Sequence, residues 1–252
     1  MTLLLKSDKV IGEPESLSLK SVQTDQYNTV LAGHKSILNF LDLPDSVADG
    51  SLIDDVFILG KQSSVSGAQT DINAKKGVTF VDGGSAFIQL PDAWDLSQYK
   101  SGDSILLSFW LKVLAVPAGS TRGLLGWRYS STNNFSVTQT TSGGLNCGVG
   151  GLSLTNIAND IIGQSFLCSI EVKIGANGFT VSTYKNKIKT QSAASSETIP
   201  KPAQLTPRIG KIDAFSSANF ICHRAFIRKF DSSKTDALTI ISDEYDKFFS
   251  NL

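Results

Sequence analysis

Short apolar runs, separated by turn-forming residues, recur at strand-like spacing along the chain from Val78 onward. Such runs, about every 8–15 residues, are typical of the strands of an all-β sandwich. Because these runs do not alternate with helical segments, a doubly wound α/β fold is not expected. The pattern predicts an all-β, antiparallel jelly-roll sandwich with strands over residues 78–81, 86–90, 105–116, 123–129, 135–139, 145–149, 166–174, 179–184, 208–212 and 220–230.

Two glycine-containing turns define the expected connections. Asp82-Gly83-Gly84 is expected to return the strand at 78–81 as a hairpin onto 86–90, since glycine supplies the positive φ angles that tight hairpins need. The sequence GANG at 175–178 predicts a second hairpin. In the long apolar strand between them, Phe109 and Trp110 are adjacent and are expected to point to opposite faces.

The two ends of the chain follow a different pattern. Apolar positions within residues 27–41 are spaced as in a short helix, and residues 61–77 are polar and predict a loop. Near the C-terminus, Leu238, Ile241 and Tyr245 have helical spacing, with Ser232 or Ser233 as the expected N-cap. We therefore expect an N-terminal docking or extension segment over residues 1–75, and a sandwich with a C-terminal helix over residues 76–252.

Composition and charge narrow the range of functions. The 252 residues are 41% hydrophobic, 18% charged and have a formal net charge of +0. Without a basic field, neither non-specific nucleic-acid binding nor attraction to an anionic membrane is expected. No apolar run is long enough for membrane insertion, and Leu3–Leu5 is too short for the core of a signal peptide. The three scattered cysteines indicate reduced thiols in a protein that folds in a cytoplasm.

Several segments carry a family resemblance. GVTFVDGGSAFIQLP at 77–91, followed by SILLSFWLKV at 104–113, resembles the opening of the concanavalin A-like, laminin-G-like jelly-roll domains. The segments EVKIGANGFTVSTYKNKIKT and PRIGKIDAFSSANFICHRAFIRKF are similar to a later hairpin and to the closing strands of that family. The resemblance covers residues 78–230 and the terminal helix, and it implies a two-sheet sandwich.

The resemblance also suggests a biological setting. Domains of this family occur in extracellular receptors, in secreted glycosidases and in tail or fibre proteins of bacteriophages, and the chain resembles the phage setting most. It then implies a virion or tail-associated structural protein that folds in the host cytoplasm without a signal peptide. Its partners would be other virion or tail proteins, bound through the N-terminal segment, and a host-surface glycan, and it would form a homo-oligomer such as a trimer.

The residues that catalysis would need are sparse. Glycosidases of this fold carry two glutamates on one strand face, one acting as acid and the other as nucleophile. The five glutamates of this chain are isolated or, like Glu13 and Glu15, lie outside the expected sandwich. We therefore expect a non-enzymatic protein. Two alternatives stay open: a polysaccharide-degrading enzyme that uses an acidic site such as Asp92 with Asp95, and a purely architectural protein without ligand.

Aromatic residues beside planar polar side chains suggest a carbohydrate site, since aromatic rings stack on the C–H faces of sugars and amides bind their hydroxyl groups. Two of these residues have a structural alternative: Trp127 can be a core residue, and Trp94 can cover one edge of the sandwich. No catalytic residue, metal ligand or cofactor is assigned. Calcium, which the resemblance implies for some members, would need loop oxygens such as those of Asp82, Asp92, Asp95, Asp103 and Asn133. The predicted ligand-binding residues are Trp127, Arg128, Tyr129, Asn133, Asn134 and Trp94.

Overall fold

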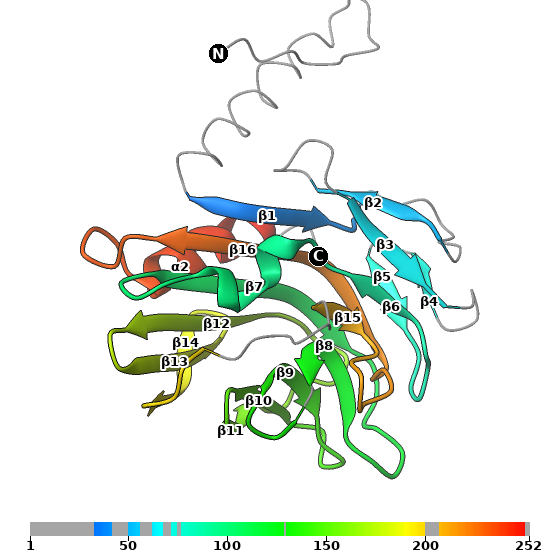
Figure 1. Ribbon diagram of the computed structural model, residues 1–252. Coiled ribbons are helices and arrows are strands. Elements are labelled where there is room, and N and C mark those ends of the chain that lie inside the picture. The colour runs from blue at the N-terminus through cyan, green and yellow to red at the C-terminus, as the bar shows by residue number, and fades with distance from the viewer. Residues whose placement is uncertain are drawn as a thin grey trace, which may run out of the picture.

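The strands of the protein form two antiparallel sheets that pack face to face (Figure 1). The computed structural model describes residues 33–41, 50–55, 62–67, 72–74, 77–128, 130–199 and 207–249. Within this part of the chain each sheet has eight strands. The predicted all-β antiparallel sandwich is therefore confirmed. None of the described helices is long and apolar enough to cross a membrane.

The first sheet has the strand order β14-β13-β12-β7-β16-β5-β4, and β1 also pairs with β16. The long strand β16 pairs with β7 along one edge, whereas β1 and β5 share its other edge. The strands of this sheet are β1 (His34–Asn39), β4 (Ile72–Ala74), β5 (Val78–Phe80), β7 (Ser104–Val113), β12 (Ser165–Gly175), β13 (Gly178–Lys185), β14 (Ile188–Ser195) and β16 (Phe220–Phe230).

The second sheet has the order β11-β10-β9-β8-β15-β6-β3-β2. Its middle is β8, which pairs with β9 on one side and with the short strand β15 on the other. The connection between β6 and β7 contains two short 3-10 helices, Asp92–Trp94 and Leu96–Gln98. The strands of this sheet are β2 (Leu52–Asp54), β3 (Gln62–Ser66), β6 (Phe87–Gln89), β8 (Arg122–Arg128), β9 (Asn134–Gln139), β10 (Leu145–Val149), β11 (Leu152–Ala158) and β15 (Arg208–Gly210).

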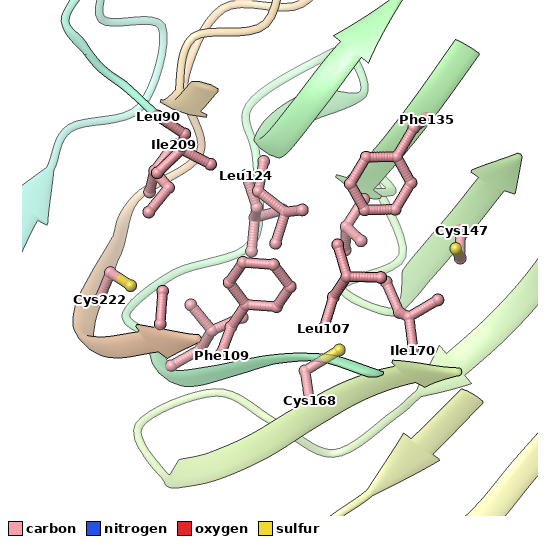
Figure 2. Packing of buried hydrophobic residues seen from close by; sticks show 14 of the residues in the cluster. Leu90, Leu107, Phe109, Leu124, Phe135, Cys147, Cys168, Ile170, Ile209 and Cys222 are labelled. Atoms are coloured by element: carbon pink, nitrogen blue, oxygen red, sulfur yellow. The ribbon is translucent and has the colours of Figure 1, made fainter. Parts of the chain in front are cut away.

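The main core lies between the two sheets, as Figure 2 shows. Leu107, Phe109 and Ile170 of the first sheet face Leu124 and Phe135 of the second, and all five are buried. The three cysteine thiols also lie in this core and form no disulfide. Burial of these large apolar side chains, worth about 2 kcal/mol each, is the main force that holds the sheets together.

The C-terminal helix α2 (Ala237–Phe248) forms a second, smaller core on the outer face of the first sheet. Trp110 belongs to this cluster and Phe109 to the main core, so the two adjacent side chains point to opposite faces as predicted. The carboxylate of Glu244 on α2 accepts hydrogen bonds from Trp110 Nε1 at 3.3 Å and from Arg224 Nε at 2.9 Å. This arrangement fixes the position of α2 on the sheet.

The predicted C-terminal helix is therefore confirmed, but its N-cap was placed too early. The side chain of Asp236, rather than Ser232 or Ser233, accepts the backbone N–H of Thr239 at 2.7 Å. An aspartate immediately before the first apolar residue of the helix is a strong cap, because its carboxylate satisfies a free N–H at the positive end of the helix dipole.

The predicted helix within residues 27–41 is wrong over its described part, where His34–Asn39 forms strand β1. Ile37 packs under α2, whereas Leu38 packs in the main core. A strand that is buried on both faces has a continuous apolar run, and a short run of this kind does not distinguish a strand from a helix.

The glycine turn after β5 does not form the expected hairpin. Strand β5 pairs with β16 in the first sheet, and β6 pairs with β15 and β3 in the second. The turn at Asp82–Gly84 therefore carries the chain from one sheet to the other, and Gly83 with φ of 74° supplies the left-handed conformation that it needs.

Residues before position 76 contribute strands to both sheets. Strands β1 and β4 belong to the first sheet and β2 and β3 to the second, so β3 and β4 occupy part of the predicted loop at 61–77. The described part of the predicted N-terminal segment is thus continuous with the sandwich. The remainder of that segment, including residues 1–32, lies outside the described residues.

Candidate functional site

The outer face of the second sheet carries a row of residues defined by strand register. Trp127 of β8 belongs to the core, so its neighbours Gly126 and Arg128 point outward. Gly126 is paired with Arg208 of β15, and Arg208 with Gln89 of β6. Cross-strand partners lie on the same face of a sheet, so Arg128 and Arg208 both project from the outer face.

Arg208 is held between an aromatic ring and a carboxylate. Its guanidinium carbon lies 4.0 Å from the centroid of the Phe87 ring, and its Nη1 donates a hydrogen bond of 3.2 Å to Asp213 Oδ1. Phe87 is half-buried on β6, two residues before Gln89 and on the same outer face. A planar guanidinium packs well on an aromatic face, and this contact limits the freedom of the arginine side chain.

Arg128 is placed in a similar way beside Phe215. Its guanidinium carbon lies 5.1 Å from the centroid of that ring, and its backbone N–H donates to Asp213 Oδ2 at 3.0 Å. Asp213 therefore binds β8 through one oxygen and β15 through the other. It does so with a positive φ of 27°, a strained conformation for a non-glycine residue.

We call these five residues, Phe87, Arg128, Arg208, Asp213 and Phe215, the arginine face. The face carries two guanidinium groups and one carboxylate, so it has an excess positive charge. Both arginines and both rings are half-exposed. Ordered guanidinium groups can donate paired hydrogen bonds to oxygen atoms, and half-exposed rings can stack on C–H surfaces.

The β8–β9 loop borders the arginine face. The hydroxyl oxygen of Ser130 accepts the backbone N–H of Asn133 at 2.9 Å, and the amide nitrogen of Asn134 donates to the carbonyls of Ser130 at 3.2 Å and Ser131 at 2.6 Å. The side-chain oxygen of Asn134 is buried without a hydrogen-bond partner among the described residues. These contacts give the loop a defined shape.

The structure brings some of the predicted site residues together and separates others. Arg128, Asn133 and Asn134 lie on or beside the arginine face, and Tyr129 lies outside the described residues. Trp127 and Trp94 are fully buried, so in this structure neither ring is available to stack on a ligand. Trp94 instead donates from Nε1 to Ser36 Oγ at 2.8 Å, and the Ser36 hydroxyl donates to Asp55.

Sequence analysis missed Arg208, Asp213, Phe87 and Phe215. Asp213 and Arg128 are 85 residues apart in the chain, and only the pairing of β15 with β8 joins them. The segment PRIGKIDAF contains three of the four missed residues, but its resemblance to closing strands indicated only a structural role.

Three aspartates of the alternative acidic site and of the calcium prediction, Asp82, Asp95 and Asp103, have separate partners. Asp95 caps the second 3-10 helix by accepting the backbone N–H of Ser97 at 2.8 Å. Asp82 pairs with Arg122 at 2.7 Å and Asp103 with Lys229 at 2.7 Å. Burial raises the pKa of Asp103, but Lys229 and Lys100 outweigh this effect and hold it below its usual value. Among the described residues, no three His, Cys, Asp or Glu side chains are grouped to hold a metal ion. Calcium binding stays a prediction.

Comparison with known proteins supports the fold. No protein-family model and no curated protein matches the sequence. Trypanosoma rangeli sialidase matches in structure with a TM-score of 0.53 and 15% identity, over 89% of this chain and 38% of the sialidase. The binding domain of botulinum neurotoxin serotype D matches with a TM-score of 0.52 and 13% identity, over 83% of this chain and 51% of that one. The chain thus spans well under two thirds of either protein, and at these identities the similarity concerns the fold.

One functional expectation is corrected by this comparison. We expected a non-enzymatic protein because the sequence has no paired glutamates on a strand. The structural neighbours include sialidases, which are enzymes, so the fold occurs in chains that carry out catalysis. The lack of that glutamate motif therefore does not support a conclusion against enzymatic activity.

Proposed function

We propose that the protein recognises carbohydrate through the arginine face. The observation that carries the proposal is the pairing of each arginine with a half-exposed aromatic ring, Arg208 on Phe87 and Arg128 on Phe215. Each pair presents hydrogen-bond donors next to an apolar surface. Sugars have the complementary combination of hydroxyl or carboxylate oxygens and C–H faces.

The two arginine side chains of the arginine face are held in place before a ligand binds. Asp213 holds the guanidinium of Arg208, and the Phe215 ring packs against that of Arg128, so a ligand does not have to order either guanidinium fully. Such preorganisation lowers the entropic cost of binding. Each guanidinium has five N–H donors. Asp213 accepts one hydrogen bond from Arg208, and the Nε–H of Arg208 is buried, so its remaining Nη donors are left for a ligand.

The structural neighbours support a carbohydrate ligand. One T. rangeli sialidase structure, matched with a TM-score of 0.55 and 14% identity, is a complex with 2,3-difluorosialic acid. The botulinum toxin match is a binding domain. Because the chain spans only part of these proteins, their complete activities are not transferred to it. On the basis of the family resemblance, we also propose that the protein is a virion or tail-associated homo-oligomer whose ligand is a host-surface glycan.

A glycan array with acidic and neutral oligosaccharides tests the proposal. We expect binding by the native protein, and loss of binding in Arg128→Ala and Arg208→Ala variants that keep the native circular dichroism spectrum. Arg122→Ala is the matched control, because Arg122 lies on the same strand, β8, but pairs with Asp82 at its other end. Equal binding by all four proteins, or no binding to any glycan, would contradict the proposal.

A further inference from the structure

Three loops at the other end of β9 surround a hollow of about 360 Å³. Its wall includes Val116 after β7, Gly144 before β10, Asn156 near the end of β11, and residues 159–162 between β11 and β12. The β8–β9 loop and the turn at 140–144 lie at opposite ends of β9, which is about 17 Å long at the usual rise per residue. The hollow is therefore separate from the arginine face.

Gly144 forms part of the floor of the hollow, and its lack of a side chain leaves room for two asparagine side chains. A Cβ atom at this position would lie 2.7 Å from Asn159 Oδ1 and 2.9 Å from Asn156 Oδ1. Two side-chain amide oxygens thus converge over a backbone without a side chain. Neither side-chain amide has a hydrogen-bond partner within the described part of the chain, so both are available to a polar ligand.

Apolar side chains form another part of the wall. Val116 is 47% exposed and Ile162 is 40% exposed, and both line the hollow. Ile162 is held by its bridge to Val113, and Val116 packs toward Gly143. A small apolar surface beside amide groups is typical of a pocket for a compact ligand with both polar and C–H faces.

The charges around the hollow are balanced. Asp160 is the carboxylate residue of the wall, and the ammonium group of Lys185 donates hydrogen bonds to the backbone carbonyls of Asn159 and Asp160. The ammonium group bound to these carbonyls disfavours a cation. The single carboxylate in the wall disfavours an anion, so an uncharged ligand fits the hollow best.

The loops around the hollow are held by their own hydrogen bonds. Thr140 N–H donates to the Gly144 carbonyl at 2.9 Å, and Gly163 N–H donates to the Val113 carbonyl at 2.7 Å. The backbone N–H of Asn156 donates to Asn146 Oδ1 at 2.9 Å, and Asn156 adopts a left-handed φ of 56°. Asparagine tolerates this conformation better than most residues, and here it places an amide over the floor.

We propose that this hollow is a second ligand site, which binds a neutral polyhydroxylated ring such as a single sugar residue. The amides of Asn156 and Asn159 bind hydroxyl groups, and Val116 and Ile162 contact the C–H face of the ring. The proposal does not depend on the arginine face, because the hollow shares none of its residues.

Titration of the ¹⁵N-labelled protein with glucose, galactose, mannose and N-acetylglucosamine, one at a time, tests the proposal by NMR. We expect at least one sugar to shift the backbone signals of residues 140–144 and 156–162 in a saturable manner. Gly144→Ala, whose methyl group would displace the side-chain oxygens of Asn156 and Asn159, and Asn159→Ala, which removes one amide, should each weaken this binding about tenfold, the effect of one lost hydrogen bond.

Thr155→Ala is the matched control, since Thr155 is exposed on β11 next to Asn156 but does not line the hollow. It should bind as the native protein does. Arg208→Ala should also keep these shifts, which distinguishes failure of this site from failure of the arginine face. The proposal is wrong if none of the four sugars shifts the two loop segments, or if Gly144→Ala and Asn159→Ala bind unchanged.

Discussion

The guanidinium carbon of Arg208 lies 4.0 Å from the centroid of the Phe87 ring. The two residues come from strands β15 and β6, which are neighbours in the second sheet, although they are more than a hundred positions apart in the chain. Asp213 holds the other side of the same guanidinium. The contact therefore orders an arginine side chain on the outer face of the sheet. A surface arginine without such a contact samples many rotamers, and ordering it costs entropy when a ligand binds.

Replacement of Glu244 tests how helix α2 is attached. Glu244→Ala removes the acceptor shared by Trp110 and Arg224, and it leaves Arg224 largely buried without its partner. We expect the free energy of unfolding to fall by about 2 kcal/mol, measured by urea denaturation. Asp246→Ala, which removes the exposed pair with Lys187 on the same helix, should cost less than about 0.5 kcal/mol. Equal effects would show that the buried position of Glu244 is unimportant.

Replacement of Trp94 distinguishes a structural from a binding role. Trp94→Phe removes the Nε1 donor to Ser36 and leaves a small cavity beside Phe109, whose ring centroid is 5.4 Å from that of Trp94. We expect a loss of about 2 kcal/mol in the free energy of unfolding, with glycan binding unchanged. A variant with native stability and weakened glycan binding would instead indicate that Trp94 contributes to the ligand site.

The three cysteines are expected to be chemically inert in the folded protein. Burial raises the pKa of the Cys168 thiol to about 12, and burial raises the pKa values of Cys147 and Cys222 well above their usual range. The reactive thiolate is therefore scarce at neutral pH. Dithionitrobenzoate should label none of the thiols before unfolding and all three in guanidinium chloride. Rapid labelling of the native protein would contradict the packing of the core.

Strand periodicity predicts most of the sandwich, because the apolar runs of the long strands β7, β12 and β16 are longer than any apolar run in the loops. The hairpin at 175–178 also follows directly from its glycines, and strands β12 and β13 pair there as predicted. The turn after β5 has an equally strong local signal but joins different sheets. Turn chemistry specifies a reversal of the chain, whereas the sheet that each strand joins depends on distant partners such as β15 and β16.

The candidate site was less predictable than the fold for a similar reason. Trp127 and Arg128 alternate along β8, so the sequence shows that one faces inward and one outward but does not specify which. The core cluster contains Trp127, which leaves Arg128 on the outer face. The ring that packs against Arg128 and the carboxylate that binds its backbone lie at Phe215 and Asp213, on a segment whose sequence gives no sign of this proximity.

The most direct test of carbohydrate recognition follows the side-chain Nε–H signals of Arg128 and Arg208 by NMR. The protein is titrated with the oligosaccharide that binds best on the glycan array, and Arg122 serves as the internal reference. The account predicts saturable shifts of the Arg128 and Arg208 signals, with the Arg122 signal unchanged. It is contradicted if the oligosaccharide binds while the signals of Arg128 and Arg208 stay in place, or if no oligosaccharide binds at all.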